Sequence, residues 1–174
     1  MSKELEIELT FLAASIPKEI DGVEPVYYED VYIPEDSEFP VLRLRKMQNK
    51  YELTKKVPVS KDDFSEHVEH TIPLDKTEYR LMKGISKRRV SKNRYRVCID
   101  GIEAEVDVFD DALKGLVLID FEFDSEAELM NFNPPKCCLV DVTQEKTILG
   151  GQLAGKSYVS MEQWLNQVGY KKLV

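Results

Sequence analysis

The segment "KELEIELTFLA", Lys3–Ala13, carries Glu4, Glu6 and Glu8 at every second position, with apolar residues between them. Side chains two residues apart point to the same face of a β-strand. We therefore predict a strand over Glu4–Leu12 that has one carboxylate face and one apolar face. The three carboxylates could face water, or they could be ligands of a metal ion. The rest of the chain has to decide between these interpretations.

The overall composition describes a globular, highly charged chain. Of its 174 residues, 43% are hydrophobic and 32% are charged, and 24 basic against 32 acidic residues give a net charge of −8. The length favours one domain, which we expect to span residues 1–174. The acidic balance argues against nucleic acid as a partner. The sequence leaves open whether the protein is a monomer or a homodimer.

The sequence also gives an expectation for the cellular compartment. No apolar run approaches the roughly 18–20 residues that span a bilayer, and the first four residues already include charges, unlike a signal peptide. Three cysteines without a C-x-x-C pair favour neither disulfides nor a zinc site. We therefore expect a cytoplasmic protein with no membrane partner.

Alternating residues and turn signals predict a strand-rich chain. The predicted strands are Glu4–Leu12, Pro25–Tyr32, Val41–Met47, Tyr51–Val57, Phe64–Ile72, Lys87–Ile99, Ile102–Phe109, Leu116–Phe123 and Leu139–Thr143. Short helices are expected near Pro17–Ile20, after Pro73, over Ser125–Asn131 with Ser125 and Glu128 as a capping box, and over Ser160–Val168. Eight or nine strands with many hairpins favour a closed or nearly closed antiparallel sheet.

Charge is sorted into blocks along these strands. The range Arg43–Lys56 has six basic residues and one acid, Leu81–Val97 has seven basic residues and no acid, and Asp100–Glu128 has eleven acids and one base. Polar strand faces can simply face solvent around an apolar core. Surface strands usually mix the two signs, however. Carboxylates suit hard divalent cations, while Arg and Lys suit phosphate oxygens, so a charged interior could hold a metal–polyphosphate complex.

A series of short motifs points to one family. In chain order they are "EIELT" at Glu6–Thr10, "RLR" at Arg43–Arg45, "LTKK" at Leu53–Lys56, "IP" at Ile72–Pro73, "KNRY" at Lys92–Tyr95, "EVDVF" at Glu105–Phe109, "GLVLIDFEF" at Gly115–Phe123 and "DVT" with a later "LA" in Asp141–Ala154. The chain thus resembles the CYTH family of triphosphate tunnel metalloenzymes. That family includes inorganic triphosphatases, thiamine triphosphatases and class IV adenylate cyclases.

The resemblance implies a fold and a set of site residues. The fold would be α+β but predominantly β: an eight-stranded antiparallel closed β-barrel, the triphosphate tunnel, with short flanking helices. The implied phosphate-binding residues are Arg43, Arg45, Lys56, Lys92 and Arg94. The implied ligands of one or two Mg²⁺ or Mn²⁺ ions are Glu6, Glu8, Glu69, Glu105, Asp107, Asp120 and Glu122, with Glu6, Glu8 and Glu122 as catalytic residues. The implied reaction is hydrolysis of the terminal phosphate of a triphosphate, inorganic tripolyphosphate in the first place.

The chain also departs from the family pattern. Thr10 stands where the family has Lys, His67 stands on a strand that usually carries Arg and Glu, and Asp120 is one methylene shorter than the usual Glu. The carboxylates implied as metal ligands match the family pattern better than the cations implied to bind phosphate. This favours retained hydrolysis. The alternatives are a tunnel that binds polyphosphate or a nucleotide without turnover, and a relative of thiamine triphosphatases or class IV adenylate cyclases.

Overall fold

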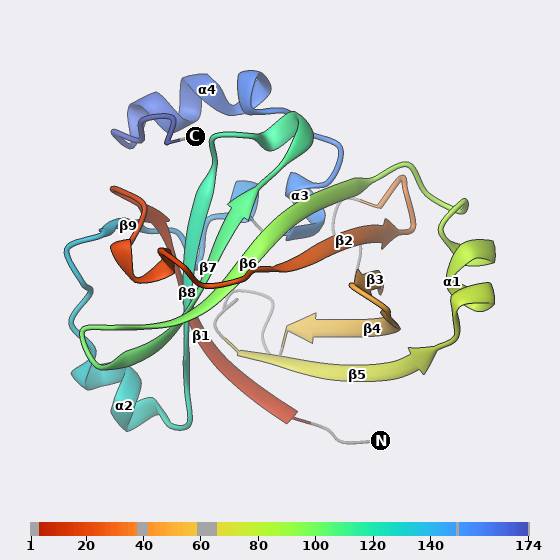
Figure 1. The fold of residues 1–174 in the computed structure, drawn as a ribbon, viewed down its shortest axis with the longest axis horizontal. Helices are drawn as coiled ribbons and strands as arrows, with labels where there is room; N and C mark the ends of the chain where they lie inside the picture. The colour runs from red at the N-terminus through yellow and green to blue at the C-terminus, as the bar shows by residue number, and fades with distance from the viewer. Residues whose placement is uncertain (1–3, 38–41, 59–65, 149, 174) are drawn as a thin grey trace.

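The computed structural model of the chain describes residues 4–37, 42–58, 66–148 and 150–173. Within these ranges one antiparallel sheet dominates the fold (Figure 1). Its strands are β1 (Glu4–Ala13), β2 (Val26–Ile33), β3 (Leu42–Met47), β4 (Lys50–Pro58), β5 (Glu66–Leu74), β6 (Arg89–Ile99), β7 (Ile102–Phe109), β8 (Val117–Phe123) and β9 (Cys138–Asp141). Each predicted strand therefore has a counterpart. The residues of the predicted strand Phe64–Ile72 that precede Glu66 lie outside the described residues, as does Val41.

The strands follow one another in the order β5-β4-β3-β2-β6-β7-β8-β1-β9. Strand β1 pairs with β8 and β9 along its later residues, and its first residues also pair with β5, from Glu4 opposite Glu69 to Ile7 opposite Glu66. The prediction of a predominantly β, antiparallel fold with few helices is confirmed. The closed eight-stranded barrel stays a prediction.

Short helices connect and flank the strands. They are the 3₁₀ turns η1 (Lys18–Ile20), η2 (Asp111–Leu113) and η3 (Lys146–Ile148), and the α-helices α1 (Lys76–Met82), α2 (Glu126–Asn131), α3 (Gly150–Leu153) and α4 (Tyr158–Gln167). None of the helices in the described ranges is long and apolar enough to cross a membrane.

The helix caps show one correction to the sequence analysis. A full capping box opens α1, where Asp75 accepts from the backbone of Glu78 and the Glu78 carboxylate accepts from the Asp75 N–H at 2.7 Å. The box predicted for α2 is only half formed. Ser125 Oγ does accept from the Glu128 N–H at 3.3 Å, but the Glu128 carboxylate accepts from Asp124, one residue before the cap.

The apolar face of the sheet carries two clusters of core residues. Phe11, Val106, Ile119 and Phe121 belong to the larger cluster. The ring of Phe132, just after α2, packs against that of Phe121 with 4.8 Å between the ring centroids. The smaller cluster packs Val31 and Leu44 against Tyr79 of α1. In Figure 1, α1 and α2 lie on opposite sides of the molecule. Alternation along the strands thus directs the apolar side chains toward these flanking segments.

The opposite face is polar along most of its length but becomes apolar at one end. There the side chains belong to Leu12, Tyr32, Val90, Phe109 and Leu118, which form one buried cluster with residues of η3, α3, α4 and the C-terminal segment. Tyr170 ties this segment to the sheet, because its hydroxyl donates to the Gly115 carbonyl and accepts from the Val117 N–H, both at 2.8 Å. The C-terminal elements therefore pack against one end of the polar face.

Candidate functional site

The strand register shows which residues share the polar face. Directly opposed residues on neighbouring strands lie on the same face of a sheet. The register pairs Glu8 with Glu122, Asp120 with Glu105, Asp107 with Arg94, Lys92 with Tyr28, Asp30 with Arg45, Arg43 with Thr54 and Lys56 with Glu69. All residues that the sequence analysis put forward therefore occupy positions of one continuous face. The positions of Glu6 and Lys56 follow from this register alone, since their side chains lie outside the described part.

Arg94 lies at the centre of an ion-pair cluster on this face. Its Nε and Nη2 bind the two oxygens of Asp107, each at 2.7 Å, and Nη2 also lies 3.2 Å from Asp120 Oδ2. The same guanidinium contacts Glu105, and the Lys92 ammonium contacts Asp107. The cations of β6 are thus neutralised by carboxylates from β7 and β8.

A second group of charges joins β2 to β3, on the side of β2 away from β6. Arg45 binds Asp30 through two parallel hydrogen bonds of 2.7 Å, and both side chains are buried. Sequence reasoning missed Asp30, although it follows Tyr28 at the spacing that puts both on the polar face of the predicted strand. On β3, Arg43 Nη2 lies 3.9 Å from Glu69, while its buried Nε has no hydrogen-bond partner within the described part of the chain.

Burial and neighbouring charges shift the pKa values of this cluster in opposite directions. Burial opposes ionisation of Asp30, but the Arg45 guanidinium outweighs it and lowers the Asp30 pKa to about 2. Asp107 is likewise buried, and Arg94 with Lys92 hold its pKa well below the ordinary value. Asp120 behaves differently. Burial and then the charge of Asp107 outweigh the attraction of Arg94 and raise the Asp120 pKa to about 7. Asp107 therefore stays ionised beside its two cations, whereas the ionised form of Asp120 is disfavoured by burial and by its negative neighbour.

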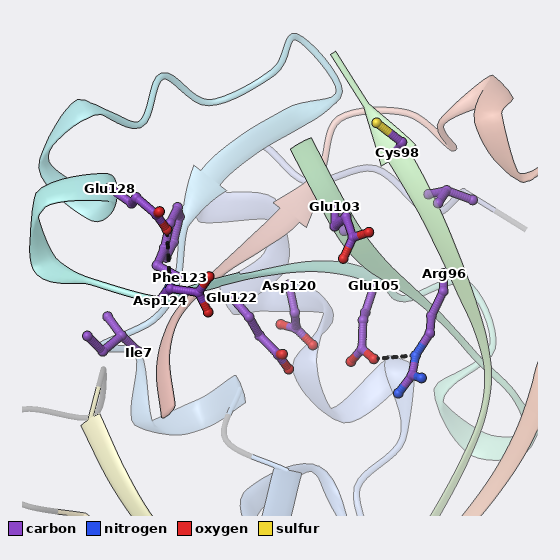
Figure 2. A pocket seen from close by; sticks show the side chains of 12 residues that line it. Ile7, Arg96, Cys98, Glu103, Glu105, Asp120, Glu122, Phe123, Asp124 and Glu128 are labelled. Atoms are coloured by element: carbon purple, nitrogen blue, oxygen red, sulfur yellow. Dashed lines mark hydrogen bonds and ion pairs between the residues drawn. The ribbon is translucent and has the colours of Figure 1, made fainter. Parts of the chain in front are cut away.

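A pocket of about 810 Å³ opens beside this cluster, between the β6–β7 hairpin, β8 and α2. Figure 2 shows Glu105, Asp120 and Glu122 side by side along one wall. Arg96 reaches across from β6, and its Nε lies 2.8 Å from Glu105. The pocket therefore gives the carboxylate part of the polar face a route to solvent.

The residues of this wall have the chemistry of a divalent-metal site. Carboxylate oxygens are the ligands that Mg²⁺ and Mn²⁺ prefer. A cation here would favour the ionised form of Asp120, which burial and then the charge of Asp107 disfavour. In the described residues, however, no three His, Cys, Asp or Glu side chains are arranged so that they could hold an ion. The carboxylates of this wall thus suit a hard cation by their chemistry. Their described positions do not form the coordination geometry of such an ion.

Comparison with known proteins identifies the family of the chain through one similar sequence. No family model matches it. An inorganic triphosphatase from Nitrosomonas europaea is 34% identical over 152 residues, which cover 86% of this chain and 96% of that protein. The chain belongs to the CYTH family. A crystal structure of an inorganic triphosphatase is 31% identical to this CYTH protein. The match covers 86% of this chain and 93% of the other chain, with a TM-score of 0.64.

A more distant structure supports the fold of this CYTH protein. It comes from Bacillus halodurans, was proposed to be an adenylate cyclase, and is 16% identical, with a TM-score of 0.56 over the whole of this chain and 95% of its own. At that identity the likeness shows the fold alone. The roles of the individual site residues are tested by neither comparison and stay predictions.

Proposed function

We propose that this CYTH protein is a metal-dependent triphosphatase that hydrolyses the terminal phosphate of a triphosphate, with inorganic tripolyphosphate as the substrate. One observation carries the proposal: cationic side chains of β3 and β6 and carboxylates of β1, β7 and β8 lie on the same face of one sheet. The relative from Nitrosomonas europaea, which is named an inorganic triphosphatase, supports this reaction class.

We further propose that this face lines a closed tunnel within a single domain of residues 1–174. The four residue pairs between β1 and β5 support closure, because they join the two ends of an eight-strand series. Since the apolar face packs on Phe132 and on Tyr79 of α1, closure of the sheet would place the polar face inside. Buried charges are costly unless they are paired or bound to ions. The ion pairs of Arg45 and Arg94 fit this requirement.

The phosphate oxygens would be bound by Arg43, Arg45, Lys56, Lys92 and Arg94. The planar guanidinium groups suit phosphate, because two N–H groups can bind two oxygens at once. The buried Nε of Arg43, which has no partner among the described atoms, is a donor that an anion would satisfy. Arg94 and Lys92 would leave Asp107 to bind phosphate oxygens, since both contact that carboxylate here.

The metal ligands would be chosen from Glu6, Glu8, Glu69, Glu105, Asp107, Asp120 and Glu122. A bound Mg²⁺ or Mn²⁺ ion would offset phosphate charge and lower the pKa of a water molecule. Glu8 and Glu122 face each other across β1 and β8. With Glu6 they are the proposed catalytic carboxylates, which orient the attacking water and accept its proton. The cationic side chains would stabilise the charge that develops on the phosphoryl oxygens.

The test compares phosphate release from tripolyphosphate, ATP and thiamine triphosphate with Mg²⁺, with Mn²⁺ and with EDTA. We expect metal-dependent release that is fastest from tripolyphosphate. Tight binding without release from any of the three would instead support a tunnel that binds polyphosphate and does not turn it over. Faster release from thiamine triphosphate or cyclisation of ATP would change the substrate but keep the site.

A further inference from the structure

The aromatic ring of Tyr28 contacts two of the proposed phosphate-binding cations. Tyr28 is on β2, while Arg45 is on β3 and Arg94 on β6, the strands that flank β2 on its two sides. The guanidinium carbons of Arg45 and Arg94 lie 4.7 Å and 5.4 Å from the ring centroid. One ring thus makes cation–π contacts with both guanidinium groups.

Each of these two arginines is also ion-paired. Arg45 binds Asp30, and Arg94 binds Asp107. Tyr28 itself is only 4% exposed. No described hydrogen bond ties its hydroxyl to either group, so the ring faces are the part of this side chain that meets the cations.

The cations on this face repel one another. Burial lowers the pKa of Lys92, and the charges of Arg94 and Arg45 lower it further. The Arg94 charge likewise opposes the Arg45 charge. An aliphatic side chain between the two guanidinium groups would offer no attraction to offset this repulsion. The negative face of an aromatic ring attracts both cations while keeping them apart.

We propose that Tyr28 is a positioning residue, whose ring holds Arg45 and Arg94 apart so that the two guanidinium groups can bind different phosphoryl groups of one polyanion. The proposal rests on the proposed triphosphatase function for the identity of the anion. The spacing of the two guanidinium groups does not depend on that function, because it rests on the contacts of Arg45 and Arg94 with the Tyr28 ring.

The first experiment measures tripolyphosphate binding by calorimetry, with Ca²⁺ in place of Mg²⁺ to slow turnover, and separates kcat from KM with Mg²⁺. Tyr28→Phe keeps the ring and should bind within about twofold of the wild type. Tyr28→Leu removes the ring and should weaken binding about tenfold or more, since both cation–π contacts disappear. The loss should appear mainly in KM. Tyr51→Leu is the matched control, because the ring of Tyr51 packs against that of Tyr79 on the other face of the sheet, with 4.9 Å between the ring centroids.

The second experiment follows the Nε–H signals of Arg45 and Arg94 by NMR without any ligand. Ring-current shifts should be present in the wild type and in Tyr28→Phe and absent in Tyr28→Leu. If Tyr28→Leu does not fold, Tyr28→Met takes its place in both experiments. Binding by Tyr28→Leu within twofold of the wild type, or an equal loss in Tyr28→Phe, would overturn the positioning role.

The two experiments distinguish failure of the proposed function from failure of the positioning role. If the wild-type protein neither binds nor hydrolyses tripolyphosphate, the proposed function is wrong, and the phosphate part of this inference falls with it. Unchanged arginine signals in the ring-free variant would overturn the positioning role even where the protein is an active triphosphatase.

Discussion

The hydroxyl of Thr10 donates a hydrogen bond to Asp120 Oδ1 at 2.8 Å. These are two of the positions at which the chain departs from the family pattern, and the structure brings them into contact. The backbone N–H of Thr10 in turn donates to the hydroxyl oxygen of Thr143 at 2.9 Å, and that hydroxyl donates to Asp141 at 2.6 Å. A shorter acid and a hydroxyl thus form a compact pair where the family has longer side chains.

The first prediction concerns this pair. Thr10→Val keeps the shape of the side chain and removes the hydroxyl, so the partly buried Asp120 loses a donor. We expect the free energy of unfolding at pH 8 to fall by about 1–3 kcal/mol, the usual range for a hydrogen bond to a charged group. Chemical denaturation measures the change.

The matched control is Thr54→Val, which removes a hydrogen bond between two neutral hydroxyls, Thr54 and Thr71. Its effect should be smaller, about 1 kcal/mol or less. Equal losses in the two variants would contradict the idea that Thr10 supports a charged partner.

The second prediction concerns the buried pair of Asp30 and Arg45. Asp30→Asn leaves a buried guanidinium without its countercharge, and removal of one partner of such a pair typically costs about 3–5 kcal/mol. Lys83→Met is the control, because the pair of Lys83 with Glu29 is partly exposed and should contribute about 0–1 kcal/mol. Urea denaturation measures the free energy of unfolding of both variants. Similar losses in the two would show that burial does not strengthen the pair of Asp30 and Arg45.

The third prediction is a pH dependence of stability that comes from the same carboxyl group. The Asp30 pKa is about 2 in the folded protein and lies near 3.9 in an unfolded chain. A lowered folded pKa stabilises the protein above the unfolded pKa, and this contribution disappears as the pH falls from about 4 toward 2. Its size is roughly 2 kcal/mol.

The comparison with Asp30→Asn isolates this one group from the other carboxylates. The difference in unfolding free energy between wild type and variant should be constant above pH 5 and should shrink below pH 4. A difference that stays constant down to pH 2.5 would mean that Asp30 does not titrate as the geometry implies.

The fourth prediction concerns the carboxylate pair on β1 and β8. Glu8→Gln keeps the size of the side chain and removes one negative charge, so metal-dependent phosphate release should fall by about 100-fold or more. Calorimetry should show weaker Mn²⁺ binding in the absence of any triphosphate. Glu162→Gln on α4, far along the chain from these strands, is the control and should leave both quantities unchanged. Wild-type activity in Glu8→Gln would rule out its proposed role.

Much of the fold could be predicted from the sequence because its strands alternate clearly. The range Ile102–Phe109 is predicted with the bounds of β7, since Asp100–Gly101 marks the turn before it. Elsewhere the bounds differ by one or two residues, as in β2 and β8. Local patterns do not show where a hydrogen-bonded ladder ends.

The site was harder to predict, since it depends on register between strands that lie far apart in the sequence. Alternation placed Arg94 and Asp107 on polar faces, but only the register shows that they are directly opposed. Asp30 was missed because a single acid between Tyr28 and Tyr32 on one face of the strand carries no motif. The tie from Thr143 to Thr10 spans 133 residues, a separation at which sequence spacing gives no signal.

The packing of η3, α3 and α4 against Leu12, Phe109 and Leu118 has a consequence for the order of events at the site. In the proposed tunnel, these elements would cover one end. A phosphate chain would then enter end first from the other end, and the released orthophosphate would leave after the shortened product. A tunnel covered in this way would favour removal of terminal groups over cuts within a long polymer.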